Sequence, residues 1–414
     1  MNIVEQAMEK LEKYNQNKII EIISKIIKEE QEKLSKQIME IDFDEIFNLY
    51  ENKDNKIDSS GNSIEPIKCV DKDKMSEEQK EELSKIGEKI IKNNQYAVVT
   101  MAGGQGTRLG FNGPKGTFKL DIGKNGKYIF EILIEKLKKA KEIYGVELNW
   151  YIMTSIENND ETINFFKEHN YFDYPKEKIK FFKQKSLPII DEEKNLLVDK
   201  NYNIKEASDG NGSVYKSLRL TNMLEDMKQN GIKWVYICGV DNIMVNMVDS
   251  ILLGLTIKNN MPSASKSVQK SYPEEKVGVF CKRNNRPTVI EYIDMTKEMV
   301  YEKNSSGELV YNQANFVSHL LSIDSIEKIS LHDLNYHCAH KKNSYIDENL
   351  QEIVPDEPNT YKFETFVFDG FEYLNDMIIM SVNRDEEFSP IKNATGVDSP
   401  ETAIQAYAKK FDCK

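Results

Sequence analysis

Residues 95–117 read QYAVVTMAGGQGTRLGFNGPKGT. Tyr96 to Met101 is a short apolar run rich in β-branched residues, which predicts a buried strand. Four glycines fall within the eight residues 103–110, and two cations, Arg108 and Lys115, lie among these and the glycines that follow. Glycine lets a backbone adopt positive φ and bring bare N–H groups against a ligand. A strand that leads into such a loop predicts a binding site for a nucleoside triphosphate.

The glycine spacing excludes two familiar phosphate-binding loops. Gly104, Gly106 and Gly110 form G-x-G-x-x-x-G, which is one residue longer than the dinucleotide fingerprint and opposes an NAD(P)-dependent oxidoreductase. Around Lys115 the order is GPKGT, which lacks the spacing of a P-loop. The loop therefore predicts phosphate binding of a different kind.

Composition limits the partners of the protein. A chain of 414 residues can hold one large α/β domain with appendages, or two to three domains. Its net charge of −12 argues against a nucleic-acid or membrane partner, so a phosphate site must be locally basic or use a divalent cation. The five cysteines include no C-x-x-C pair, and residues 1–13 lack the apolar segment of a signal peptide. These features predict a cytoplasmic protein with reduced thiols.

Patterns of strand and helix alternate in the centre of the chain. Strands are expected at 96–101, 149–155, 180–184 and 233–240, and helices at 76–93, 129–144, 161–170 and 214–229. Such alternation predicts an α/β fold with a doubly wound, mostly parallel sheet that binds ligands at the carboxyl ends of its strands.

The flanking segments have simpler patterns. Isoleucines recur at helical spacing between residues 19 and 27, so residues 1–50 are expected to be helical, and residues 51–70 to be a polar loop. Residues 277–282 and 287–295 predict a hairpin, and a helix is expected around residues 370–380. We divide the chain into a helical region (1–92), a catalytic domain (93–370) and a short C-terminal segment (371–414).

Two further short motifs are candidates for the site. Asp241 and Asn242 follow a strongly apolar strand, which suits a Mg²⁺-binding carboxylate, although an aspartate that caps the next helix is the alternative. Residues 209–212 read DGNG, and by their chemistry alone they predict a β-turn.

Several of these motifs resemble one family. The loop is similar to the signature GGxGTxLGxxxPK of the UDP-sugar pyrophosphorylases, and its sequence AGGQGTRLG is most similar to that of the UDP-N-acetylglucosamine branch. Further blocks that resemble the family follow in family order between about residues 37 and 394, including WYIMTS, KQKSLP, VDN, YPEEKVGV, YNQAN, KFETFVFD and FSPIKNA. The family form PDGNGG is SDGNGS here, with Ser208 and Ser213 as departures.

The resemblance implies a fold and an activity. The implied fold is a mostly parallel, mixed, Rossmann-like nucleotidyltransferase sheet (GT-A-like) with a helical N-terminal appendage. The implied reaction converts UTP and an N-acetylhexosamine 1-phosphate, of glucosamine or galactosamine, to the UDP-sugar and pyrophosphate, with Mg²⁺ or Mn²⁺. Independently of the resemblance, we expect a monomer. A UTP–glucose-1-phosphate uridylyltransferase, a broad-specificity enzyme and a non-catalytic UDP-sugar-binding protein are the alternatives. The family's YNAGN is YNQAN here, which leaves the N-acetyl preference open.

The resemblance also assigns roles to single residues. It assigns phosphate contacts in catalysis to Arg108, Lys115 and Lys392, and the metal to Asp241. The residues that it assigns to the nucleotide are Ala102, Gly103, Gly104, Gln184 and Gly210. Those that it assigns to the sugar pocket are Asn211, Gly278, Glu291, Tyr292, Asn315, Phe366 and Phe368.

Overall fold

The computed structural model describes residues 1–54 and 63–411. The chain divides into two compact units. The smaller unit contains residues 1–61, 185–212 and 334–366, and the larger unit contains residues 62–184, 213–333 and 367–414. Residues 185–212 and 334–366, which lie within the predicted catalytic range 93–370, therefore belong to the smaller unit.

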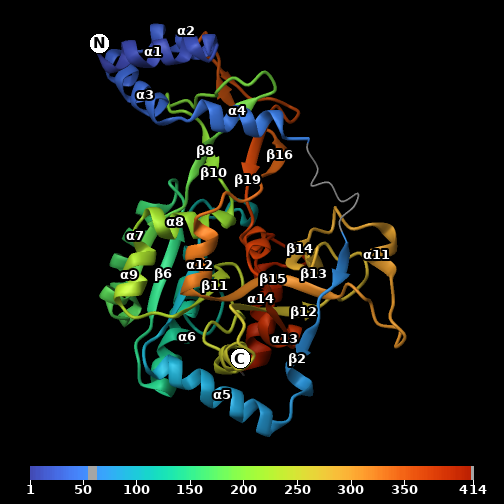
Figure 1. The fold of residues 1–414 in the computed structure, drawn as a ribbon. Coiled ribbons are helices and arrows are strands. Elements are labelled where there is room, and N and C mark those ends of the chain that lie inside the picture. The colour runs from blue at the N-terminus through green and yellow to red at the C-terminus, as the bar shows by residue number, and fades with distance from the viewer. Residues whose placement is uncertain (55–62, 412–414) are drawn as a thin grey trace. The chain divides into compact units, whose positions relative to one another are not determined.

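The larger unit is built on an 11-stranded mixed sheet (Figure 1). Its main path is β2 (Cys69–Asp71), β20 (Ile378–Ser381), β12 (Ser263–Gln269), β15 (Gln313–Ser322), β11 (Trp234–Gly239), β3 (Tyr96–Met101), β6 (Asn149–Thr154) and β7 (Ile179–Lys183). Strands β11, β3, β6 and β7 are parallel, as are β12, β20 and β2, whereas β15 is antiparallel to both of its neighbours. At the side, β13 (Val279–Arg283) pairs with β1 (Ile64–Pro66), β14 (Arg286–Ile290) and β15. The predicted α/β class and the mostly parallel, mixed sheet are confirmed.

Helices cover both faces of this sheet. The helices of the larger unit are α5 (Glu77–Lys92), α6 (Ile129–Tyr144), α7 (Asn159–Glu168), α8 (Val214–Leu220), α9 (Met223–Gln229), α10 (Ser250–Lys258), α11 (Lys297–Tyr301), α12 (Ile323–Ser330), α13 (Arg384–Glu387) and α14 (Pro400–Phe411). Successive strand residues point to opposite faces. The Trp150 ring packs against Phe130 of α6, with ring centroids 6.1 Å apart, whereas the Tyr151 hydroxyl donates to Asp226 of α9 at 2.7 Å. The sheet is therefore doubly wound.

Three expectations of secondary structure are wrong. The expected helix 214–229 is two helices, because Asn222 between them adopts a left-handed φ of 61°. The described part of the expected loop 51–70 contains β1 and β2, which pair with strands more than two hundred residues away, whereas residues 55–62 of that loop lie outside the described residues. The expected helix around 370–380 is a 3₁₀ turn (Val367–Tyr373) followed by the buried strand β20, and periodicity cannot distinguish so short an apolar run from a helix.

The smaller unit has its own apolar core. It contains α1 (Ile3–Lys13), α2 (Asn17–Lys25), α3 (Lys28–Glu40) and α4 (Phe43–Glu51). Its short strands are β8 (Ser186–Pro188), β9 (Ile190–Asp191), β10 (Glu206–Ser208), β16 (His337–Lys341), β17 (Tyr345–Ile346), β18 (Glu352–Ile353) and β19 (Thr360–Glu364). The predicted isoleucine stripe of α2 packs against apolar side chains such as Ile190 and Phe363 from the two later segments. The helices share one core with residues 185–212 and 334–366.

Within residues 1–54 and 63–411, no helix has both the length and the apolar composition needed to cross a bilayer.

Helices α5 and α10 approach each other closely at two glycines. A Cβ atom on Gly254 would lie 1.8 Å from the carbonyl oxygen of Leu83, and one on Gly87 would lie 2.0 Å from the carbonyl oxygen of Ser250. Both obstacles are backbone atoms, which cannot turn away as a flexible side chain can.

Replacing Gly254→Ala should therefore separate the two helices. Overpacking of this kind lowers the free energy of unfolding by about 1–3 kcal/mol, which urea denaturation would measure. Lys85→Ala on the exposed face of α5 is the control, and a surface change of this kind costs at most about 0.5 kcal/mol. Equal losses in the two variants would contradict the close packing.

Candidate nucleotide-binding site

The loop after β3 is anchored to the neighbouring strand. The Ala102 N–H donates to the carbonyl of Met153 on β6 at 2.8 Å, and the Asn158 side chain donates to the Ala102 carbonyl at 2.9 Å. These bonds hold the first residue of the loop at the carboxyl end of the parallel strands, where α/β sheets bind ligands.

The rest of the loop closes on itself. Gly106 N–H donates to Gly113 at 2.9 Å, and Lys115 N–H donates to Gly104 at 3.1 Å. The N–H groups of Gly103 and Gly104 have no hydrogen-bond partner among the described residues. A Cβ on Gly104 would meet nothing within 4 Å, so its backbone faces open space. Bare N–H groups beside open space suit a ligand that presents acceptor oxygens.

The two cations of the loop differ in their surroundings. Arg108 lies in a short 3₁₀ turn (Thr107–Leu109), is exposed, and makes no ion pair or hydrogen bond with any described residue. Lys115 is half-buried, and its ammonium donates to the carbonyl of Ile391 at 3.2 Å. Lys115 is thus fixed against a segment that lies far along the chain, whereas Arg108 is available to a ligand.

That segment, residues 387–392, is held at the carboxyl end of β11. The Asn242 side-chain amide donates to the carbonyl of Glu387 at 2.7 Å, and its oxygen accepts from Ser389 N–H at 3.0 Å. Ile391 N–H donates to the carbonyl of Asp241 at 2.9 Å. Lys392 follows directly, and its ammonium lies 3.8 Å from the Asp398 carboxylate. Ile391 therefore contacts the Asp241 carbonyl through its N–H and the Lys115 ammonium through its carbonyl, and Lys392 is the next residue.

Asp241 fits the metal that the resemblance implies. Its half-buried carboxylate folds back so that a Cβ on Gly239 would lie 2.6 Å from Oδ1, and it forms no hydrogen bond or ion pair with the described residues. Over the same part of the chain, no three Asp, Glu, His or Cys residues cluster as a complete metal site. Mg²⁺ commonly takes one or two carboxylates together with phosphate oxygens and water, so a single free carboxylate beside a phosphate loop suits this metal.

Gln184 lies beside the glycine loop. It is buried, its N–H donates to the Thr154 carbonyl at 2.8 Å, and a Cβ on Gly103 would lie 2.8 Å from its side-chain amide. The absence of a side chain at Gly103 therefore lets the Gln184 amide reach the loop.

Three of the residues assigned to the sugar also lie together in the larger unit. Asn315 N–H donates to the carbonyl of Gly278 at 2.8 Å, and a Cβ on Gly278 would lie 2.7 Å from a carboxylate oxygen of Glu291. Tyr292 differs, because its side chain is 42% exposed and makes no hydrogen bond or ring contact with a described residue. Phe368 is buried within the 3₁₀ turn 367–373.

The remaining three residues belong to the smaller unit. Gly210 adopts a φ of +92°, and a Cβ there would lie 2.1 Å from the Thr365 carbonyl oxygen. Asn211 follows in the same turn, which Gly212 N–H ties to that carbonyl at 2.9 Å. Phe366 packs against the His337 ring, with centroids 4.6 Å apart. The turn predicted at 209–212 is therefore docked tightly onto residues 365–366.

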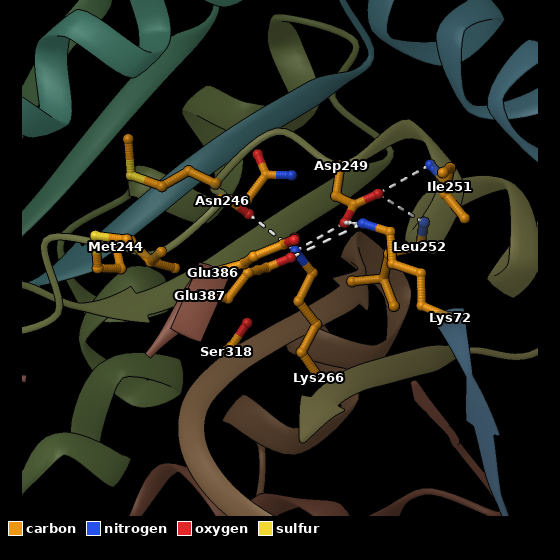
Figure 2. Close-up of polar contacts among 12 residues, drawn as sticks. Lys72, Met244, Asn246, Asp249, Ile251, Leu252, Lys266, Ser318, Glu386 and Glu387 are labelled. Atoms are coloured by element: carbon orange, nitrogen blue, oxygen red, sulfur yellow. Dashed lines mark hydrogen bonds and ion pairs between the residues drawn. The ribbon is translucent and has the colours of Figure 1, made fainter. Parts of the chain in front are cut away.

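A buried charge cluster was not predicted. Lys266 lies between Asp249 and Glu387, with Lys72 at its edge (Figure 2). Its strand reads SASKSVQ, a polar pattern that is typical of an exposed strand, so the sequence carried no signal for burial. The role of the Asn242 side chain was also missed, because its partners lie about 145 residues away.

The buried thiols are not nucleophiles. Burial raises the pKa of Cys238 and of Cys281 to about 12. Both cysteines are free thiols, and because of these raised pKa values they are protonated at neutral pH.

Together these features define an α/β nucleotidyltransferase, with a glycine-rich loop and an unpaired carboxylate at the carboxyl ends of parallel strands. The chain belongs to the UTP–glucose-1-phosphate uridylyltransferase family, whose model matches residues 41–397.

Named relatives are consistent with this class. The chain is 33% identical to UDP-N-acetylglucosamine diphosphorylase 2 of Arabidopsis thaliana over 96% of its own length and 82% of that protein's. It is 37% identical to UDP-N-acetylglucosamine pyrophosphorylase of Saccharomyces cerevisiae, over 78% and 70% respectively. The crystal structure of the uridine diphosphate N-acetylglucosamine pyrophosphorylase of Trypanosoma brucei with an inhibitor superposes with a TM-score of 0.81 at 27% identity, covering 99% of this chain and 85% of that one.

Gly210→Ala should disrupt the turn of the smaller unit. The variant combines strain at φ +92° with a backbone clash, so it should lower the thermal midpoint of the protein. Gly231→Ala is the matched control, because Gly231 has a φ of +72° but open space around its Cβ position. If the two variants lower the midpoint equally, the contact with Thr365 has no energetic weight.

Proposed function

We propose that this protein transfers a uridylyl group from UTP to N-acetylglucosamine 1-phosphate, or to the galactosamine epimer. The products are the UDP-N-acetylhexosamine and pyrophosphate. The observation that carries the proposal is the convergence of Lys115, Asp241 and the segment 390–392 beside a glycine loop with bare N–H groups. The names of the relatives support the choice of sugar.

The chemistry is an in-line displacement at phosphorus. A phosphate oxygen of the sugar 1-phosphate forms a bond to the α-phosphorus of UTP. The bond from that phosphorus to the bridging oxygen breaks, and pyrophosphate leaves with the electron pair. Negative charge spreads over several oxygens, so catalysis rests on positioning and on charge stabilisation.

The cations divide this work. Arg108, exposed and without an internal partner, binds the leaving pyrophosphate. Lys115 and Lys392 neutralise charge on the α-phosphate and on the attacking phosphate. Asp241 would hold Mg²⁺, or Mn²⁺ in its place, and the metal supplies positive charge to phosphate oxygens when it is bound.

Other residues recognise the rest of the substrates. Ala102, Gly103, Gly104 and Gln184 contact the uracil side of UTP. Gly278, Glu291 and Asn315 bind the hexosamine, and their mutual contacts support this assignment. For Gly210, Asn211, Tyr292, Phe366 and Phe368, the assignment to nucleotide or sugar rests on the resemblance. The protein acts as a cytoplasmic monomer in this proposal.

The second candidate is a glucose-1-phosphate uridylyltransferase or a broad-specificity enzyme. The family description names that activity, and the change from YNAGN to YNQAN lies in the segment assigned to the acetamido group. A silent UDP-sugar-binding protein is opposed by the joint presence of Arg108, Lys115, Asp241 and Lys392.

One assay distinguishes these hypotheses about the activity and the preferred sugar. The purified protein is incubated with UTP, Mg²⁺ and each of three sugar 1-phosphates, and pyrophosphate release is followed. Release with the N-acetylhexosamine phosphates at the highest rate is expected. No release with any sugar would overturn the enzymatic proposal, and a higher rate with glucose 1-phosphate would favour the second candidate.

Lys115→Ala should slow the reaction strongly. Loss of one charge-stabilising donor at a reacting phosphate lowers kcat by roughly 10²–10³-fold. Lys119→Ala, an exposed lysine four residues further along, is the control and should leave the rate near the wild-type value. A near-normal rate for Lys115→Ala would remove this residue from the site.

Asp241→Asn should lower the affinity of the site for Mg²⁺, because a neutral amide binds Mg²⁺ poorly. The Mg²⁺ concentration for half-maximal rate should rise at least about tenfold, since even outer-shell changes at metal sites reach that size. The exposed Asp121→Asn removes the same charge elsewhere and should leave the Mg²⁺ titration unchanged. Identical titrations for the two variants would exclude Asp241 as a ligand.

A further inference from the structure

Lys266 carries a charge in the interior of the larger unit. It lies on β12, its side chain is fully buried, and its strand neighbours flank a register shift in the pairing with β15. Figure 2 shows its ammonium between two carboxylates. The distances are 2.8 Å to Asp249 and 2.6 Å to Glu387, and the ammonium also donates to the Asn246 carbonyl at 3.3 Å.

The members of this cluster hold one another in their charged forms. Burial alone would lower the pKa of Lys266, but the carboxylates of Asp249 and Glu387 outweigh burial and hold that pKa above its usual value. Burial alone would likewise raise the pKa of Asp249, but Lys266 and Lys72 hold it well below its usual value. Well-packed apolar side chains often stabilise a core as well as such a cluster does. Stability alone therefore does not explain the cluster, and its role is inferred from the hydrogen bonds that Asp249 and Glu387 form with other residues.

Asp249 and Glu387 form hydrogen bonds with different segments of the larger unit. Asp249 caps helix α10, because its Oδ1 accepts from the N–H groups of Ile251 at 3.0 Å and Leu252 at 3.1 Å (Figure 2). Glu387 ends α13, and its carbonyl accepts from the Asn242 amide at 2.7 Å. One carboxylate thus fixes a helix, and the other fixes the segment that continues to Lys392.

We propose that Lys266 is a positioning residue that acts through Glu387 to fix residues 389–392 at the carboxyl end of β11. The inference rests on the proposed function, because its effect on activity runs through the phosphate contacts of that site. The ammonium holds Glu387 in place, and Glu387 and Ser389 together bind the two ends of the Asn242 amide. Ile391 then reaches Asp241 with its N–H and Lys115 with its carbonyl, and Lys392 follows. Within the described residues, Lys266 itself forms no hydrogen bond or ion pair with a residue assigned to substrate.

A matched pair of variants tests this inference. Glu387→Gln and Asp249→Asn each remove one of the two carboxylates from Lys266, and both residues are 4% exposed. Both should lower the thermal midpoint. Only Glu387→Gln should speed amide hydrogen exchange in peptides that cover residues 388–395 and lower kcat by roughly 10–100-fold, the size typical of groups that orient site ligands.

Coupling to Lys392 supplies a readout that a purely structural role would not move. If Glu387 acts by placing Lys392, Glu387→Gln should cost much less activity in a Lys392→Ala background than in the wild type. Should Glu387→Gln not fold, Glu387→Asp keeps the charge and withdraws the carboxylate by one CH₂, and it should show the same pattern at smaller size.

The possible results are distinct. Equal exchange at residues 388–395 in Glu387→Gln and Asp249→Asn would overturn the inference. So would full additivity of Glu387→Gln with Lys392→Ala. A wild-type protein that releases no pyrophosphate would refute the proposed function, and the exchange measurement would then decide the positioning role by itself.

Discussion

The side chain of Asn242 is the contact on which the candidate site depends. Its amide donates to Glu387, and its oxygen accepts from Ser389 at 3.0 Å and Met244 at 3.2 Å. The residue is buried, so each group left without a partner would cost about 1–3 kcal/mol. One satisfied amide therefore binds the end of a central parallel strand to a segment near the C-terminus. As a result, the segment that contains Lys392 lies against Lys115 of the glycine loop.

Local charge in this site opposes the charge of the whole protein. The chain carries a net charge of −12, yet three cations lie in or next to the glycine loop. Arg108 and Lys115 are part of the loop, and Lys392 follows Ile391, whose carbonyl accepts from Lys115. Asp398 faces Lys392, and the carboxylate of Asp241 suits a metal. Further inside, the charge of Lys266 is offset by two buried carboxylates, which Lys72 also contacts. The site can therefore attract phosphates within an acidic molecule.

Features with local signals could be predicted from the sequence. The buried strands β3 and β6, the helix α6 and the hairpin β13–β14, with Asn284 and Asn285 in left-handed turn positions, all follow from short-range patterns. The glycine loop and Asp241 were placed correctly at the carboxyl ends of strands for the same reason. The pairing of β2 and β20, the shared core of the smaller unit and the burial of Lys266 depend on partners far away in the sequence. No pattern within a window of ten residues carries that information.

A crystal structure of the protein with UTP and Mg²⁺ tests the central claim most directly, namely that the glycine loop, Asp241 and residues 390–392 form one triphosphate site. We predict the uracil against Ala102, Gly103, Gly104 and Gln184, phosphate oxygens within hydrogen-bonding distance of Arg108 and Lys115, and the metal on Asp241. A triphosphate bound elsewhere, with these groups untouched, would contradict it.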